Sequence, residues 1–220
     1  MGSPRGPGNG LQLAGGAAVA GQVNGLQIAV INVGDAVNGV QLGVINVARE
    51  VRGAQVGVIN LAENADASVG LLSLVRNGRF DLELYGSDLA PANVSIKMGG
   101  RSLYTYLAAG SGLPSDEGTW TAGGGFGTHL PLGRWSLDLD LGAQNQRSYV
   151  TGVLGDSLTS QLRAQVAFHV AQRFALFAGP TLNVRVRFDL EESGSATPMP
   201  VTRLSDRVQL WPGLVAGVRI

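Results

Sequence analysis

The chain has 220 residues, of which 33 are glycine and only 15% are charged, a composition poor in charge for a soluble enzyme. Sixteen lysines and arginines balance sixteen aspartates and glutamates, so no basic field exists that would collect nucleic acid. Cysteine is absent, which excludes disulfide scaffolds, thiol nucleophiles and cysteine-type zinc sites, and no apolar run is long enough for a membrane-spanning helix.

Residues 1–23 are expected to form a disordered N-terminus followed by a degenerate first repeat. The opening of the chain is rich in glycine and proline, which favours irregular structure. The segment 11–20 has some features of a signal-peptide core. Residues 10–14, Gly-Leu-Gln-Leu-Ala, copy residues 25–29, Gly-Leu-Gln-Ile-Ala, and this favours the interpretation as a repeat.

Residues 24–76 repeat one phrase. Asn24-Gly-Leu-Gln-Ile-Ala-Val-Ile-Asn-Val33 returns at 38–47 and again, slightly changed, at 52–61, and a looser copy occupies 69–74. A fixed period is typical of stacked or laddered units. The β-branched residues predict one strand in each copy, about eight to ten residues long.

Both faces of each predicted repeat strand are largely apolar. This pattern suits a strand that is buried on both sides, and equally a strand that lies between lipid and water. Glutamine and asparagine recur at the same positions of each repeat, and their side-chain amides are expected to hydrogen-bond to one another along a ladder. They are Gln27, Gln41, Gln55, Asn32, Asn46 and Asn60.

From Arg79 onward the sequence alternates strictly between apolar and polar residues, which predicts half-buried strands. Trp135 and Leu137, for example, alternate with Ser136 and Asp138. Four short connections each contain arginine, at 76–79, 99–101, 132–134 and 171–173, and the connections between them are longer, at 86–92, 111–118, 146–157 and 191–206. Tight turns at one end and long loops at the other are typical of an outer-membrane barrel.

Aromatic residues support the same interpretation. Phe80, Trp135 and Phe174 each follow the arginine of a short turn, which places three rings at one height. Trp120 and Phe188 are expected near the opposite rim. Rings at both heights would form the girdles that mark the two membrane interfaces of a barrel.

The chain resembles a family of bacterial surface-repeat proteins. In this family, tandem Gly-x-Gln-aliphatic-Gly-aliphatic-aliphatic-Asn phrases precede a β-barrel-like C-terminal part. The repeats at 24–61 carry most of the resemblance, and segments 100–104 and 125–133 echo the C-terminal part. The resemblance implies a place at the cell surface or outer membrane. It implies no activity and no catalytic residues.

The predicted fold is therefore all-β, an antiparallel transmembrane barrel of about twelve strands. Residues 77–220 supply eight strands, the repeats supply four more, and 24–220 form one barrel. The tight Asn77-Gly78 turn favours this count, because it leaves little room for a domain boundary before Phe80. The alternative is an eight-stranded barrel that follows a β-solenoid-like repeat region.

The faces assigned by alternation predict a charged lumen. Its expected members are Asp81, Glu83, Lys97, Asp138, Asp140, Arg163, Arg185, Arg187, Asp189 and Arg219. Five acids and five bases in a narrow barrel are expected to pair and fill the space. A selective pore would carry an excess of one sign. The sequence thus predicts a closed barrel without general porin activity.

Catalysis is not expected. A Ser-His-acid site would require Ser136 or Ser160 to meet His129 or His169 beside Asp138, and no local motif supports it. No cofactor or metal is expected either. Acidic pairs at 116–117 and 191–192 could contact calcium or lipopolysaccharide-bound cations, but solvated loop charges are the preferred explanation.

The functional expectation is an outer-membrane surface protein of structural or interaction type in a bacterial cell envelope. Its partners would be outer-membrane lipid and an extracellular ligand held by the loops 146–157 and 191–206. The alternative is a soluble or surface-attached β-repeat binding module, similar to an adhesin.

Overall fold

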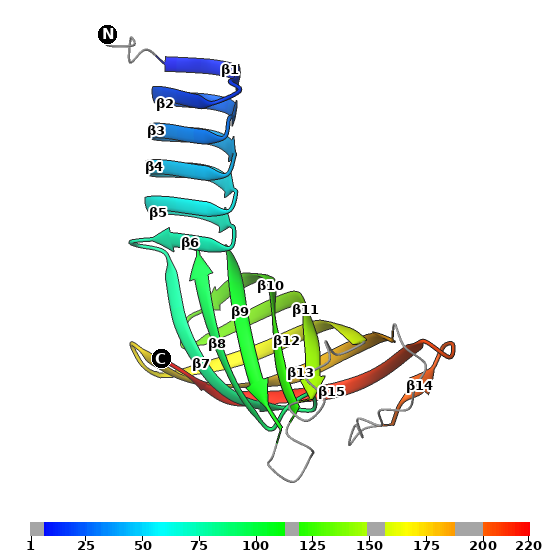
Figure 1. The fold of residues 1–220 in the computed structure, drawn as a ribbon. Coiled ribbons are helices and arrows are strands. Elements are labelled where there is room, and N and C mark those ends of the chain that lie inside the picture. Colours follow the sequence, from blue (N-terminus) through cyan, green and yellow to red (C-terminus); the bar gives the residue numbers. More distant parts are fainter. Residues whose placement is uncertain (1–6, 113–118, 149–156, 188–199) are drawn as a thin grey trace. The chain divides into compact units, whose positions relative to one another are not determined.

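The computed structural model describes residues 7–112, 119–148, 157–187 and 200–220, and all the regular elements in these ranges are β-strands (Figure 1). The chain divides into two compact units, one made of the residues up to Phe80 with Lys97–Thr105, the other of Asp81–Ile96 with Tyr106–Ile220. Nowhere in the described ranges is there a helix long and apolar enough to cross a membrane. The predicted all-β class is confirmed.

The strands fall into two groups. Strands β1 to β6 are Pro7–Leu13, Ala17–Ile28, Ile31–Leu42, Ile45–Val56, Ile59–Val69 and Leu72–Val75. Strands β7 to β15 are Arg79–Ser87, Ala92–Gly99, Leu103–Ser111, Thr119–Leu132, Trp135–Ser148, Ser157–Ala171, Phe174–Arg187, Thr202–Arg203 and Val208–Arg219.

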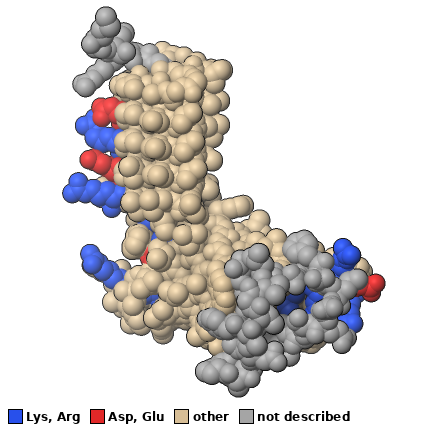
Figure 2. Space-filling model, in the orientation of Figure 1, with Lys and Arg blue, Asp and Glu red and all other residues tan. Residues whose placement is uncertain are grey.

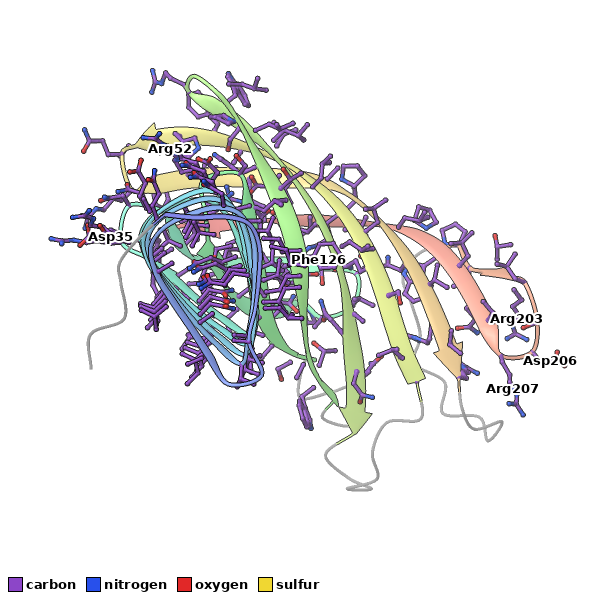
Figure 3. The ribbon with its side chains drawn as sticks, turned by 90° about the horizontal axis from the view of Figure 1, so that it is seen from above. Asp35, Arg52, Phe126, Arg203, Asp206 and Arg207 are labelled. Atoms are coloured by element: carbon purple, nitrogen blue, oxygen red, sulfur yellow. The ribbon has the colours of Figure 1, made fainter. Side chains whose placement is uncertain are left out.

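Strands β1 to β6 form a parallel ladder, in which each strand pairs with the next copy of itself. Ile31 pairs with Ile45 and Ile45 with Ile59, so one coil of the ladder takes one repeat. Seen from above, the coils lie over one another (Figure 3). Equivalent residues of successive repeats therefore form straight columns.

Two columns of amides occupy the interior of the ladder. Gln41 donates to Gln27 at 2.7 Å, and Gln55 donates to Gln41 at 2.9 Å. Asn32 donates to Asn46 at 2.8 Å, and Asn46 continues the row to the next coil. The two rows donate in opposite directions along the ladder. The expected amide ladder is confirmed, and it pairs fully buried polar groups except at the row ends, where Asn32 Oδ1 and Gln55 Oε1 have no partner among the described residues.

A glycine at one corner of each coil explains why the repeats keep this residue. Gly25, Gly39 and Gly53 have φ angles of 135°, 144° and 138°. A Cβ atom on Gly39 would lie 2.0 Å from the carbonyl oxygen of Gly25. Glycine adopts this conformation without a steric penalty and lets successive coils approach closely.

The remaining long strands close into an eight-stranded barrel, in the order β9-β10-β11-β12-β13-β15-β7-β8, with β8 returning to β9 (Figure 1). The pairs from β10 to β15 and from β15 to β7 are antiparallel. Short turns connect the strands at one end of the barrel and longer segments connect them at the other. The eight strands predicted after Arg79 are confirmed.

The preferred count of about twelve strands is wrong, and the alternative of an eight-stranded barrel after a solenoid-like region describes the structure. The repeat strands pair with one another in parallel, because each repeat turns through a full coil and returns in the same direction. A twelve-stranded antiparallel barrel would need a turn between the second and third repeats, but residues 49–53 lie within β4. The tight turn at Asn77-Gly78 exists, and it joins the ladder strand β6 to the barrel strand β7.

Removing whole coils tests the parallel ladder. Deletion of 38–51 removes one coil and keeps every column in register, so the variant should fold with a ladder one coil shorter. Deletion of 38–44 removes half a coil and should disrupt the ladder, because inward and outward side chains no longer align. Far-ultraviolet circular dichroism and thermal melting of both variants are the measurements. An antiparallel arrangement would instead tolerate deletion of 24–51 and fail after deletion of 38–51.

Candidate functional site

The outer wall of the barrel is apolar. The side chain of Phe80 is 65% exposed, and those of Phe126 (Figure 3) and Trp135 are each 51% exposed. The exposed large apolar residues of the barrel strands also include Leu82, Leu84, Val94, Leu103, Leu107, Leu130, Leu132, Leu139, Leu141, Leu158, Leu162, Val166, Val170, Phe174, Leu176, Leu182 and Leu214. A contiguous wall of this kind far exceeds the apolar patches of ordinary soluble surfaces.

The inner wall is polar and charged. Its buried side chains include Glu83, Asn93, Ser95, Lys97, Thr121, Ser136, Asp138, Asp140, Gln144, Thr159, Gln161, Arg163, Gln165, Thr181, Asn183, Arg185, Gln209 and Arg219. Charged residues are rarely buried in soluble proteins unless they are paired. The alternation therefore puts the charged residues inside and the large aliphatic residues outside, the reverse of a water-soluble barrel, although a smaller buried cluster inside is apolar and aromatic (Tyr85, Ala167, Ala175, Phe177 and Val215).

One ion-pair cluster centres on Arg219 of β15. Its Nη2 lies 2.6 Å from Glu83 Oε1 of β7 and 2.6 Å from Asp138 Oδ2 of β11. Ser95 Oγ donates to the other oxygen of Glu83 at 2.9 Å, and His129 Nδ1 lies 2.6 Å from Asp138 Oδ1. Because each carboxylate has a second partner, the buried charges on β7, β11 and β15 are held together.

A second cluster centres on Arg163 of β12. Its Nη2 lies 3.0 Å from Asp140 Oδ2, and both side chains are fully buried. Arg163 Nη1 donates to the hydroxyl of Tyr85 at 3.1 Å, and its guanidinium lies 4.3 Å from the centre of the Tyr106 ring. Ion pairing and cation–π contact together compensate the cost of burying this cation.

A third cluster lies at the end of the barrel with the longer connections. Asp88, between β7 and β8, accepts hydrogen bonds from Trp211 at 2.7 Å, Asn183 at 2.9 Å and Thr181 at 3.1 Å. Trp211 is fully buried, and the guanidinium of Arg185 lies 4.9 Å from the centre of its ring. The segment between β7 and β8 is thereby tied to the inner faces of β13 and β15.

The structure brings together only part of the charged set predicted for the lumen. Glu83, Asp138 and Arg219 meet, with Asp81 at 4.0 Å from Arg219, and Asp140 meets Arg163. The remaining members behave differently. Arg185 donates to Gln146 and Thr159, Lys97 donates to Tyr104, Arg187 is half-buried, and Asp189 lies outside the described residues.

The predicted aromatic rings lie at the ends of strands. Phe80, Trp135 and Phe174 are exposed on the outer wall at the short-turn end of β7, β11 and β13. Trp120 is half-buried near the start of β10, and Phe188 lies outside the described residues. The Trp135 ring packs against Phe168 with centroids 4.8 Å apart.

The serine and histidine residues do not assemble a triad. Ser136 Oγ lies 3.1 Å from His169 Nε2, but Asp138 contacts the other histidine, His129. Ser136 is also buried, so its hydroxyl faces the packed interior. Within the described ranges, no three histidine or acidic side chains are grouped so that they could hold a metal ion.

Asp88 and Trp211 are the main residues of the interior that sequence reasoning missed. Trp211 shares the alternation of Arg219 on the last strand, and this signal could have placed it inside. Asp88 follows no pattern, because it belongs to a connection.

Searches among protein-family models, curated proteins and solved structures find no match to this chain.

The Arg219 cluster makes a measurable contribution to stability. Replacing Arg219 with leucine should lower the free energy of unfolding by about 3–5 kcal/mol, because Glu83 and Asp138 stay buried without their cation. Arg173→Leu is the matched control, since Arg173 is exposed in a short turn and should change stability by less than about 0.5 kcal/mol. Urea unfolding compares the two, and equal midpoints would show that Arg219 does not act as a buried ion-pair centre.

Proposed function

We propose that this protein is an integral outer-membrane β-barrel with a closed lumen, which serves a structural or surface-interaction role in a bacterial cell envelope. The observation that carries the proposal is the reversed polarity of the barrel, apolar outside and charged inside. Lipid is the solvent that favours such a wall. The resemblance of the repeats to bacterial surface-repeat proteins points to the same location.

The dimensions of the wall agree with a bilayer. Strands β10 to β13 have 14 or 15 residues each. A tilted strand of about ten residues already spans the apolar band of roughly 25 Å. Between the strand ends, the outward positions whose side chains the structure describes carry no charge. A closed barrel also leaves no unpaired backbone edge to face lipid.

The lumen is filled rather than open. Trp211, Arg163 and Tyr106 are among the largest fully buried side chains, and Asp88 bonds to inward-facing residues of β13 and β15 at one end. An eight-stranded barrel has an interior just wide enough for side chains. Arg163 and Arg219 pair with acids of neighbouring strands, and Arg185 bonds to neutral side chains, so the interior does not present one sign along a path. These features support a structural barrel over a general porin.

The topology assigns a role to each end of the barrel. The short turns that contain arginine would face the periplasm, and the long connections would face outward. The surface-interaction role then belongs to the connections at 146–157 and 191–206. Most of both ranges lies outside the described residues, so their ligand chemistry is a matter for direct binding experiments.

A second candidate function is a β-repeat binding module, similar to an adhesin. The parallel ladder favours it, because stacked coils form extended surfaces that bind other molecules. This function is compatible with a membrane barrel in the same chain. It would replace the barrel proposal if the chain proved to be soluble.

An arginine on the outer wall separates lipid from water as the surrounding solvent. Leu139→Arg, in the middle of β11, should destabilise a barrel in a bilayer by about 2–4 kcal/mol. Leu132→Arg, at the end of β10, should cost at most about 1 kcal/mol, because it lies near the interface. Urea unfolding in lipid vesicles gives both values. A water-exposed wall would tolerate the two substitutions equally, within about 0.5 kcal/mol.

Conductance tests the closed lumen. Purified protein in a planar lipid bilayer should give no steady channels of porin size, because buried side chains fill the barrel. A known porin reconstituted in the same way serves as the positive control. Steady open channels from this protein would contradict the proposed closed lumen while leaving its place in the membrane intact.

A further inference from the structure

The outer surface of the ladder also carries many exposed aliphatic residues. Arginine, aspartate and glutamate lie along one edge of the ladder, and the rest of its visible face lacks charge (Figure 2). Asp35 and Arg52 both lie on this edge (Figure 3). Exposed aliphatic residues form columns elsewhere on the ladder. They include Val30, Val44, Val58 and Leu71 in one column, and Val19, Leu61 and Leu74 in another.

One part of this apolar surface is hollowed into an open groove of about 460 Å³. Val47, Leu61 and Leu74, equivalent residues of three successive coils, lie along it, and Phe80 at the start of β7 adds an aromatic ring. The volume lies within the usual range of roughly 300–1,000 Å³ for small-molecule sites. The aligned side chains give the groove a length of three coils.

Charged groups lie at the C-terminal end of the groove. Arg76 and Arg79 line it together with Glu63, its only carboxylate among the described lining residues. Arg76 is exposed and forms no ion pair within the described part of the chain. Arg79 is almost fully buried, and its guanidinium lies 4.5 Å from the centre of the Tyr104 ring. The net charge of the lining is therefore positive.

We propose that this groove binds a long-chain fatty acid. The half of the acyl chain next to the carboxylate would lie along the Val47, Leu61 and Leu74 column, which extends about 10 Å at the usual strand spacing, and the carboxylate would meet the exposed guanidinium of Arg76. An apolar groove that ends at a cation is complementary to an amphiphile with one anionic head group. A neutral hydrocarbon would make no ion pair with Arg76. A second copy of the ladder is a less suitable occupant. Packed here around a two-fold axis, it would bring two Arg76 side chains close together, and their positive charges would repel.

The groove belongs to the unit that contains the ladder, whereas the ion-pair clusters centred on Arg219 and Arg163 lie in the other unit. Fatty-acid binding is thus separate from the proposed barrel function. It assigns a ligand class to a surface that the repeats build, and it can be measured whether or not the barrel lies in a membrane.

Photolabelling of the whole chain tests the assignment. The probe is a palmitic acid that carries a diazirine on its chain, added to purified protein in neutral detergent, with labelled segments mapped by proteolysis and mass spectrometry. Segment 53–76 should be labelled, and excess unlabelled palmitate should abolish this labelling. The barrel segment 174–185 serves as an internal reference, because label on its apolar wall should not be saturable.

Substitutions at exposed positions identify the groove. Leu74→Asp should lower labelling of 53–76 about tenfold, because it removes apolar contact within the groove. Leu71→Asp is the matched control, since Leu71 is 61% exposed on another column and should have no effect. Arg76→Glu should lower labelling by the acid roughly threefold and leave labelling by its methyl ester unchanged, and Arg49→Glu should alter neither.

Two results would overturn the assignment. Label on 53–76 that unlabelled palmitate does not displace would show only partition onto an apolar surface. Equal losses from Leu74→Asp and Leu71→Asp would show that the groove is not the binding site. Circular dichroism of each variant establishes that the ladder is folded, so a loss of labelling reports binding. If segment 174–185 is not labelled, that result concerns only the proposed lipid-facing wall of the barrel and leaves the fatty-acid site unaffected.

Discussion

Both parts of this fold follow from the requirement that backbone amide and carbonyl groups be paired. A strand with an unpaired edge is costly in water and more costly in lipid. The ladder meets this requirement by stacking each repeat on the previous copy, so that backbone bonds join equivalent residues. The barrel meets it by closure, with β8 returning to β9. The chain thus uses parallel stacking and antiparallel closure for the same purpose.

Side-chain polarity then decides what each part can do. In the ladder, buried amides bond along the columns and fix the register of the coils, while aliphatic residues face outward. In the barrel, paired charges occupy the interior, and Arg219 and Arg163 join carboxylates from neighbouring strands. These ion pairs compensate much of the cost of burying the charges inside the barrel. A packed lumen and an apolar wall are the properties expected of a structural membrane barrel.

Much of the barrel could be predicted from sequence because alternation has a simple meaning there. Alternate residues of a strand face opposite sides, so the sequence placed Asp138 and Asp140 on one face and Leu139 on the other. The structure buries the two acids and exposes the leucine. The direction of the repeats could not be predicted in the same way. A period of even length keeps each side chain on its own face in a hairpin pair and in a coil alike. The glycine of each repeat was the available signal, because Gly39 needs a positive φ that an extended strand does not. The Asp88 cluster depends on a connection that folds inward, for which no periodic signal exists.

The proposed contact of the outer barrel wall with lipid can be measured directly with spin labels. The natural chain lacks cysteine, so single cysteines introduced along β11 can each carry one nitroxide label. Collisions of the label with oxygen and with a water-soluble nickel complex report the surrounding solvent. If the wall faces lipid, labels at 137, 139 and 141, in protein reconstituted in vesicles, should collide with oxygen far more than with nickel, while labels at 138 and 140 should collide with neither. High accessibility of 137, 139 and 141 to the nickel complex would contradict it.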